Sequence, residues 1–454
     1  MKVVKKNKII IGSVILVFIA AIGIYPMINK NNSNSKEENT IKIYSEEQSG
    51  PPRMLQATID EFRRKYPNIK VEKVVFNDAQ KYNQKLLSDT LAGGGPDVLY
   101  FCAQGVNARI LQKSGVLTDV KPLIDEDKSF KKADYNFKVI NAGIYKDKLM
   151  LVPIDYGVNG YLSTKQLLDK SNIKLGDNIS ESDFVNTISS KLKSTNGGKT
   201  FFAYPIKITD FIVSSGIDFI DYENKKLYFN KKEFKIIIDN YKKIYKLTPK
   251  SSDFTGYSGE EGKAALKNGT TLFSDDEAVL SYPLGLLNSE SQMKIATGED
   301  IVLNTIPTYS GKNDPIAIVN ECMGINSKSK NKQAAYNFIK IALSQKSQQN
   351  IISIPVNRIT AKYIESNYLK QFNGKNSVVV SDGNSSSGVT LIRPSTDIQK
   401  YYKNITRNIK EAKITDPTMD KLMMECFSGY FEDKQSYESA LVVLENKVKL
   451  YINE

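Results

Sequence analysis

Histidine is absent from this chain of 454 residues, and so is tryptophan. Without histidine the chain cannot build a Ser-His-Asp or Cys-His catalytic arrangement, nor a metal site with histidine ligands. Without tryptophan, any aromatic face on which a ligand stacks must come from the 25 tyrosines or the 19 phenylalanines. The two absences therefore exclude whole classes of catalytic and metal centre.

Cysteine is scarce, with only Cys102, Cys322 and Cys426 in the chain. None of them has CxxC spacing, so the sequence predicts no zinc site and no other metal site. An odd count leaves at least one free thiol unless a second chain supplies a partner. We interpret the cysteines as small buried residues, while a bond between Cys102 and Cys322, both near the ends of predicted strands, stays open.

The chain has no dense cluster of basic residues, although its formal net charge is +13. Its basic residues, mostly lysine, are spread out, with no dense arginine cluster and no nucleic-acid motif, so we expect no nucleic-acid partner. A lysine excess that faces an anionic cell envelope is the simpler interpretation. With 41% apolar and 25% charged residues the composition is globular, and the length suits two or three lobes.

The amino terminus carries an export signal. Four lysines precede an uncharged apolar run over residues 9–25, which would rise about 25 Å as a helix and reach a bilayer core of about 30 Å once residues 26–28 are added. There is no Ala-x-Ala site and no lipid-attachment cysteine after the run. We therefore interpret residues 1–28 as an uncleaved membrane anchor with its lysines inside, and cleavage between residues 20 and 29 as the alternative. Residues 29–40 contain no apolar side chain that could pack in a core. They therefore predict a flexible tether that leads to the first strand.

Residues 54–101 predict an α/β fold. Leu55, Ile59 and Phe62 share one helical stripe, and Pro67 ends that helix. A strand over 69–76, a helix over 79–91, a glycine-rich turn over 93–97 and a strand over 98–101 follow. Strands that alternate with helices form a parallel sheet covered on both faces, and ligands bind at the carboxyl ends of its strands. We therefore expect ligand contacts in the loops just after strands.

The rest of the chain continues the α/β pattern. It predicts strands over 148–153, 272–273 and 315–326, and helices over 106–114, 234–247, 332–348 and 437–451, the last with Ser436 as its N-cap. The chain crosses between lobes first after Pro153. No internal repeat of 20 to 50 residues is present.

Four segments, 58–71, 91–98, 324–339 and 354–357, together resemble the family 1 extracellular solute-binding proteins of ABC sugar importers. The first resembles the first helix and strand of that family, the second its glycine-proline-aspartate turn, and the third its late strand-to-helix element. The predicted terminal helix also suits the Gram-positive branch of that family. The chain departs from the family in two ways. It lacks the usual lipidated cysteine, and it lacks the tryptophans that commonly stack on sugars.

The resemblance implies an α/β, two-lobed, periplasmic-binding-protein-like fold of type II, with mixed sheets flanked by helices and an apolar helix in front. Lobe one would be residues 41–153 plus 313–354, and lobe two 154–312 plus 355–454. Such a protein is a monomer that needs no cofactor and catalyses nothing. It captures an oligosaccharide between its lobes by hinge closure on the extracellular face of the membrane, and delivers it to an ABC permease.

The loops after strands supply the candidate ligand-binding residues. Carboxylates and amides there would accept hydrogen bonds from sugar hydroxyls, and an aromatic ring would stack. Asp155 and Tyr156, after the first crossing, are the strongest pair. Asp97 is left out, because in its turn it should hold backbone N–H groups. The full set is Glu46, Glu47, Gln48, Cys102, Gln104, Asp155, Tyr156, Tyr282, Asn320 and Glu321.

Three other functions stay open. The same fold could bind a peptide or a polyamine, for which several acids would face a narrow slot. An anchored sensor could present its ligand to a receptor. A glycoside hydrolase with two carboxylates is the enzymatic alternative, and the resemblance points away from it.

Overall fold

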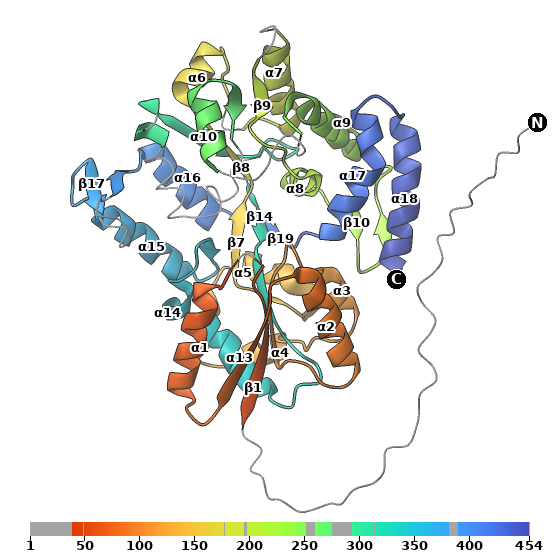
Figure 1. Cartoon of the computed structure of the whole chain (residues 1–454), viewed down its shortest axis with the longest axis vertical. Helices are drawn as coiled ribbons and strands as arrows, with labels where there is room; N and C mark the ends of the chain where they lie inside the picture. The colour runs from red at the N-terminus through yellow and green to blue at the C-terminus, as the bar shows by residue number, and fades with distance from the viewer. Residues whose placement is uncertain are drawn as a thin grey trace, which may run out of the picture. The chain divides into compact units, whose positions relative to one another are not determined.

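The computed structural model describes residues 39–48, 50–176, 178–194, 198–250, 259–274, 293–295, 297–312, 314–380 and 389–453. None of the helices in these ranges is both long enough and apolar enough to span a membrane. The predicted anchor over residues 1–28 and nearly all of the predicted tether lie outside the described residues. From Thr40 onward the chain forms a mixed α/β structure, as predicted (Figure 1).

The first sheet contains five strands in the order β2-β1-β3-β15-β6. β1 runs parallel to β2 and β3, whereas β15 runs antiparallel to β3 and β6. The carboxyl ends of β1, β2, β3 and β6 therefore lie at the same edge as the amino end of β15. The strands are β1 (Thr40–Glu46), β2 (Lys70–Phe76), β3 (Val98–Cys102), β6 (Val152–Pro153) and β15 (Glu321–Ile325).

Helices cover both faces of this sheet. The chain leaves β1 for β2 on one side and returns to β3 on the other, so right-handed crossovers place the first two helices on opposite faces. On one face, Phe62 is buried and its ring centroid lies 5.4 Å from that of Phe338. The helices and short elements of this part are α1 (Arg53–Lys65), α2 (Ala79–Leu91), α3 (Ala108–Lys113), α4 (Lys121–Glu126), η1 (Lys132–Asp134), α5 (Phe137–Ile140), η2 (Asn141–Gly143), β4 (Ile144–Tyr145), β5 (Lys148–Leu149), α13 (Lys332–Ala342) and α14 (Gln345–Gln348).

The second sheet has four strands in the order β16-β7-β14-β19. They are β7 (Asp155–Val158), β14 (Ile316–Val319), β16 (Ile354–Pro355) and β19 (Glu411–Lys413). Three short links join it to the first part of the fold: Ile154 between β6 and β7, Asn320 between β14 and β15, and residues 349–353 between α14 and β16. In Figure 1, β7, β14 and β19 run up the centre, above β1 and its helices.

Smaller sheets and helices surround an aromatic core beyond the second sheet. There, the ring centroid of Phe273 lies 4.9 Å from that of Tyr161 and 5.7 Å from that of Phe184. The elements are α6 (Lys165–Lys170), α7 (Glu181–Ser194), α8 (Ile208–Ser214), α9 (Lys232–Leu247), α10 (Gly259–Lys267), β8 (Gly160–Thr164), β9 (Thr200–Phe202), β10 (Ile220–Asp221), β11 (Lys226–Leu227), β12 (Thr271–Phe273) and β13 (Ile301–Thr305).

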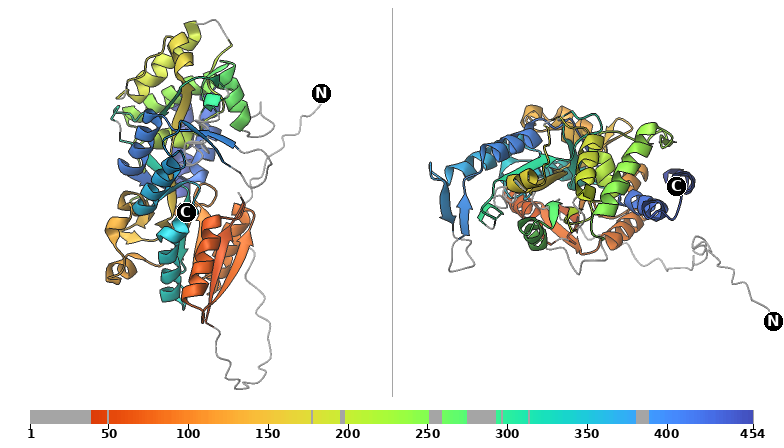
Figure 2. Two further views of the ribbon diagram at one scale, coloured as in Figure 1. Left: turned by 90° about the vertical axis from the view of Figure 1, so that its left-hand side faces the viewer. Right: turned by 90° about the horizontal axis from the view of Figure 1, so that it is seen from above.

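The carboxyl-terminal region adds four helices and a hairpin. The last two helices pack as a pair (Figure 2). The ring centroids of Tyr430 and Tyr437 lie 5.7 Å apart between them. The predicted N-cap is confirmed, because the Ser436 hydroxyl accepts a hydrogen bond from the Ser439 N–H at 3.1 Å. The elements are α15 (Arg358–Lys370), β17 (Ser377–Val380), β18 (Val389–Ile392), α16 (Thr396–Arg407), α17 (Pro417–Phe431) and α18 (Tyr437–Asn453).

Two predicted strands are wrong as single elements. Residues 148–153 form β5 and β6 with a break between them, because the N–H groups of Met150 and Leu151 bond the Gly143 carbonyl at 3.1 and 3.2 Å instead of a neighbouring strand. Residues 315–326 form β14 and β15, which belong to different sheets. The predicted helix over 106–114 is shorter, beginning at Ala108 after its Asn107 cap.

The two-lobed fold class is therefore supported, while the lobe boundaries remain a prediction. Sheet membership agrees with a change of lobe after Pro153. It favours Asn320 over residue 313 for the return crossing, because β14 pairs with β7 and β19.

Candidate functional site

Three of the predicted ligand residues meet at the carboxyl edge of the first sheet. Glu46 ends β1, Cys102 ends β3, and Glu321 begins β15 directly opposite Cys102. The Cys102 N–H donates to Glu46 Oε2 at 3.2 Å. The antiparallel register places the side chains of Cys102 and Glu321 on the same face of the sheet. These three residues, which come from separate strands, therefore lie close together at one edge of the sheet, and their role as ligand contacts stays a prediction.

Asp155 joins this group from the start of β7, with a side chain only 4% exposed. Its Oδ1 accepts the Glu321 N–H at 2.9 Å, and its Oδ2 accepts the Ser353 hydroxyl. Its backbone carbonyl accepts the Asn320 N–H at 3.3 Å. Asp155 thus follows one of the three links and bonds segments of the other two, at Asn320–Glu321 and at Ser353. As a direct ligand contact, each of these residues stays a prediction.

Burial and like charge perturb the carboxyls of this group. Desolvation and the nearby Glu321 carboxylate raise the pKa of Asp155 well above its ordinary value. Desolvation, together with the charge of Glu46, raises the pKa of Glu321 to about 7. Burial also raises the pKa of the Cys102 thiol to about 11, so the thiol stays protonated at neutral pH.

Tyr156 lies away from this edge. Its side chain is 1% exposed, and its hydroxyl donates to the Ile405 carbonyl at 3.3 Å. That bond ties β7 to α16 and gives the ring a packing role. As a ligand residue, Tyr156 stays a prediction that would require it to leave this position.

Glu47 and Gln48 follow Glu46 in the turn after β1. Glu47 is buried, pairs with Lys73 at 3.0 Å, and accepts the Ser45 hydroxyl at 2.7 Å. The Gln48 N–H donates to Glu46 Oε1 at 2.9 Å. The Glu47 carboxylate is therefore engaged in contacts within the protein, whereas the Gln48 side chain is exposed.

Gln104, in the loop after β3, contacts a segment that the sequence did not single out. Lys207, directly before α8, donates from Nζ to Gln104 Oε1 at 3.3 Å. The bond joins the first-sheet edge to the part of the chain beyond the second sheet. Lysine is so frequent in this chain that nothing in the sequence distinguishes Lys207.

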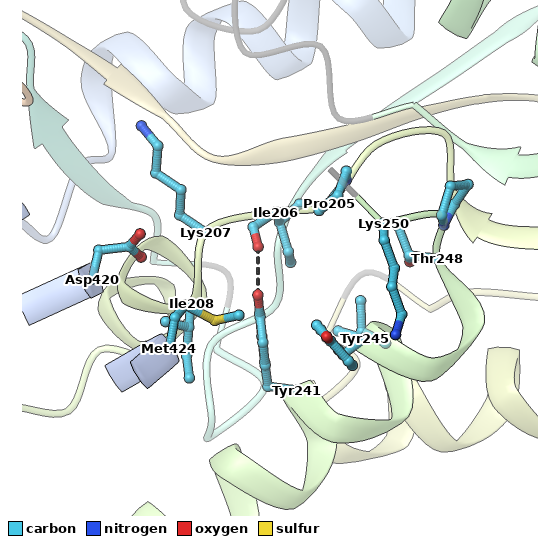
Figure 3. Close-up of a pocket in the computed structure, with 12 residues that line it drawn as sticks. Pro205, Ile206, Lys207, Ile208, Tyr241, Tyr245, Thr248, Lys250, Asp420 and Met424 are labelled. Carbon is cyan, nitrogen blue, oxygen red and sulfur yellow. Dashed lines mark hydrogen bonds between the residues drawn. The ribbon is translucent and has the colours of Figure 1, made fainter. Parts of the chain in front are cut away.

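Lys207 also lines a pocket of about 330 Å³, shown in Figure 3. Tyr241 donates from its hydroxyl to the Ile206 carbonyl at 2.7 Å and forms part of the wall with Tyr245. Sequence reasoning missed this pocket because its walls come from three separate segments. The lining residues are Pro205, Ile206, Lys207, Ile208, Tyr241, Ile244, Tyr245, Thr248, Pro249, Lys250, Asp420 and Met424.

Asp97 has the structural role that we predicted. Its Oδ2 accepts the Lys42 N–H at 2.8 Å and its Oδ1 accepts the Ser329 hydroxyl at 2.5 Å. It thereby fixes the glycine-rich turn to β1 and to the end of β15.

The open question of a cysteine bond is answered by the strand register. Cys322 pairs with Phe101 and Cys102 with Glu321, so the two thiols point to opposite faces of the sheet, and all three cysteines are free. Across the described residues no group of three or more acidic or cysteine side chains could hold a metal ion. Tyr282 lies outside the described residues.

Comparison with known proteins supplies a family and a fold. Residues 47–349 match the sequence model of a family described as bacterial extracellular solute-binding protein. A search of curated protein sequences finds no match.

Solved structures of similar fold cover nearly the whole chain at low sequence identity. The sugar-binding protein MalE of Xanthomonas citri aligns with a TM-score of 0.65 at 15% identity, over 91% of this chain and 97% of its own. A putative oligosaccharide periplasmic-binding protein of Synechococcus sp. gives 0.63 at 13%, over 91% and 99%. An ABC substrate-binding protein of Listeria monocytogenes in complex with cycloalternan gives 0.60 at 15%, over 92% and 98%.

Proposed function

This chain belongs to the bacterial extracellular solute-binding protein family, and we propose that it captures an oligosaccharide between its two lobes and delivers it to an ABC permease. The observation that carries the proposal is the convergence of Glu46, Gln104 and Glu321 at one sheet edge, where Lys207 approaches from the other side. Structural relatives that bind cycloalternan, maltose or acarbose by their descriptions support a sugar as the ligand class.

The chemistry of this edge suits sugar hydroxyls. A hydrogen bond to a charged group contributes about 1.5–3 kcal/mol, and micromolar affinity requires about 8 kcal/mol. Three to five polar contacts and one stacked ring supply that energy after ordering is subtracted. Because tryptophan is absent, a tyrosine or a phenylalanine must provide the ring, and the partly exposed Tyr245 lines the pocket that Lys207 shares.

A thermal-shift panel on the full chain tests the ligand class. Maltose, acarbose and cycloalternan should raise the unfolding temperature, since a ligand at 100 times its Kd stabilises the native state by about 2.7 kcal/mol. Glu46→Gln should weaken binding of the active sugar by about 10-fold or more, because a charge-assisted bond becomes a neutral one. Glu72→Gln, at an exposed carboxylate on β2, is the matched control and should bind normally. A panel in which no sugar raises the unfolding temperature contradicts the proposal.

A second candidate ligand, a polyamine, is favoured by one specific observation. Among the described residues, no lysine or arginine forms an ion pair with Glu46, Asp155 or Glu321, so these acids could face a cationic ligand. Spermidine and a short peptide therefore belong in the same panel. A shift with spermidine alone would replace the sugar in the proposal and leave the family unchanged.

We propose that the protein is a monomer on the extracellular face of the membrane. Its uncleaved amino-terminal segment would anchor it there. Lysines ahead of the apolar run over residues 9–25 support this orientation. Intact mass measurement of the membrane-bound protein tests it. A mass that lacks the first 20 to 29 residues would indicate the cleaved, secreted alternative.

A further inference from the structure

The last helix of the chain reaches from lobe two to lobe one, with the lobe boundaries as predicted. In Figure 1 the carboxyl end of α18 lies beside α3, and the Lys113 ammonium of α3 donates to the Ile452 carbonyl at 3.2 Å. This contact lies outside the three links, at Ile154, Asn320 and residues 349–353. The two lobes therefore touch at a place where no chain connects them.

Asn107 is at the centre of this contact, and its side chain is buried. Its side-chain oxygen caps α3 by accepting the Ile110 N–H at 3.1 Å, so its amide nitrogen is the group that meets lobe two. That nitrogen shares its two hydrogens among the hydroxyls of Tyr451 at 2.7 Å and Thr418 at 2.8 Å and the Asp416 carboxylate at 3.3 Å. The Tyr451 hydroxyl in turn donates to Asp416 at 2.8 Å. We call these four residues, Asn107, Asp416, Thr418 and Tyr451, the latch.

Further bonds between the lobes lie beside the latch. The Arg109 guanidinium of α3 lies 4.9 Å from the Tyr222 ring centroid and donates to the Ile414 carbonyl at 3.4 Å. In the turn between β4 and β5, the Lys146 N–H donates to the Glu223 carboxylate at 2.9 Å. A contact that involves this many separate elements cannot survive intact when one lobe turns on the other.

One loop carries both the candidate site and the latch. It leaves β3 as a tight turn, in which the Val106 N–H bonds the Cys102 carbonyl at 3.0 Å. Gln104 in this loop meets Lys207 of lobe two at 3.3 Å, and Asn107 follows three residues later. Opening the cleft at the candidate site therefore draws Asn107 away from lobe two.

We propose that the latch holds the two lobes in the closed arrangement, and that its release accompanies opening of the cleft to ligand. The chemistry makes the release reversible. When Asn107 leaves, the hydroxyls of Tyr451 and Tyr222 stay on the Asp416 carboxylate, at 2.8 and 3.1 Å, and water takes the place of the amide. Exchange of a protein hydrogen bond for one to water changes the free energy only modestly, so both forms are accessible.

The latch thereby sets the fraction of molecules that are closed before ligand binds. The apparent dissociation constant of a ligand that requires the closed form is its intrinsic constant divided by that fraction. A tenfold shift toward the open form would weaken binding by up to about tenfold. The inference rests on the two-lobed part of the proposed function and is independent of the ligand that the protein binds.

Small-angle X-ray scattering from the full chain without ligand tests this inference at neutral pH. In Asn107→Asp, one carboxylate oxygen still caps α3, while the amide donor is replaced by an oxygen that faces Asp416. The two like charges then oppose the closed arrangement. We expect a larger radius of gyration than in the wild type. If circular dichroism shows that Asn107→Asp does not fold, Tyr451→Phe replaces it, because this variant removes the hydroxyl between Asn107 and Asp416.

Two matched controls lie on α18. Asn446→Asp adds the same charge at an exposed position, and it should keep the wild-type radius. Tyr437→Phe removes a hydroxyl at the other end of the helix, where the ring packs on Phe427 within lobe two, and it should also keep the radius.

A latch variant with the wild-type radius overturns the proposal, even if urea unfolding shows reduced stability, because a purely structural tie would change stability alone. An equal increase in radius in its matched control also overturns it. Because no sugar is present, a failed sugar panel leaves this result standing, and an unchanged radius leaves the sugar proposal standing.

Discussion

Replacing Asp155 with alanine should destabilise the protein, because Asp155 serves the junction between the sheets. The change removes the acceptor of the Glu321 N–H at 2.9 Å and of the Ser353 hydroxyl. Leaving a buried donor unpaired costs about 1–3 kcal/mol. The Ser353 hydroxyl can rotate to another acceptor and the Glu321 N–H cannot, so we expect a loss of about 2–4 kcal/mol at pH 5.

The size of this loss should depend on pH, with a definite sign. The pKa of Asp155 is raised in the folded state by burial and by Glu321, so the folded wild type binds more protons than the unfolded chain. Its contribution to stability is complete below the ordinary pKa of 3.8 and is lost as the pH rises through the raised value. Alanine has no charge to bury. The loss of unfolding free energy in Asp155→Ala, relative to the wild type, should therefore be smaller at pH 8 than at pH 5.

Urea unfolding followed by circular dichroism at pH 5 and pH 8 measures both effects. Asp155→Asn keeps one acceptor oxygen, so it should resemble the wild type at pH 5 and exceed it at pH 8. Asp60→Ala, at an exposed carboxyl on α1, controls for the loss of a surface charge and should change little at either pH. Unchanged stability of Asp155→Ala together with lost ligand affinity would refute the reasoning and restore Asp155 as a direct ligand contact.

Three further substitutions test other parts of the account. Burial raises the pKa of Glu181 to about 8, so the wild type should lose at most about 5 kcal/mol of stability as the pH rises from 4.5 to about 8. Glu181→Gln should not show this loss, and parallel pH profiles of variant and wild type would contradict the prediction. Asn107 caps α3, and its Nδ2 donates to Thr418 at 2.8 Å and to Tyr451 at 2.7 Å. Asn107→Ala should therefore lower stability by about 2 kcal/mol and speed hydrogen exchange in α18. Unchanged exchange in α18 would contradict a stabilising role for these hydrogen bonds. Gly143→Ala should lower stability by at least about 3 kcal/mol, because the new Cβ would lie 1.8 Å from the Leu151 carbonyl oxygen, whereas Gly94→Ala, with its nearest atom at 3.7 Å, should fold normally in the same expression assay.

The sequence was most informative where periodicity and chemistry agree. The stripe of Leu55, Ile59 and Phe62 predicted α1, and the glycine-proline-aspartate turn predicted both β3 and the backbone role of Asp97. Local patterns decide such elements, because they report which residues must be buried and which backbone groups need partners.

The sequence could not show where one extended run changes sheets. Residues 315–326 read as one strand because both halves are apolar, yet Asn320 separates strands with different partners. The partners lie about 160 to 220 residues away in the chain, at β7 and β3, so only tertiary pairing reveals the break.

From the sequence, one could predict that some candidate residues lie close together, but not the contacts of each side chain. The rule that ligands bind at the loops after strands selected Glu46, Cys102 and Glu321, and these three residues lie close together in the structure. It could not foresee that Asp155 would bond the links, that Tyr156 would face α16, or that Lys207 would reach Gln104. Each of those roles depends on which segment lies opposite, and the segments are far apart in the sequence.

A crystal structure with the sugar that gives the largest thermal shift tests the central proposal most directly. We predict one sugar between the lobes, with hydrogen bonds to Glu46, Gln104 or Glu321 from the first-sheet edge and to Lys207 from the other side. A sugar held by residues of one lobe alone, with the three links unchanged from the ligand-free protein, would contradict capture by closure.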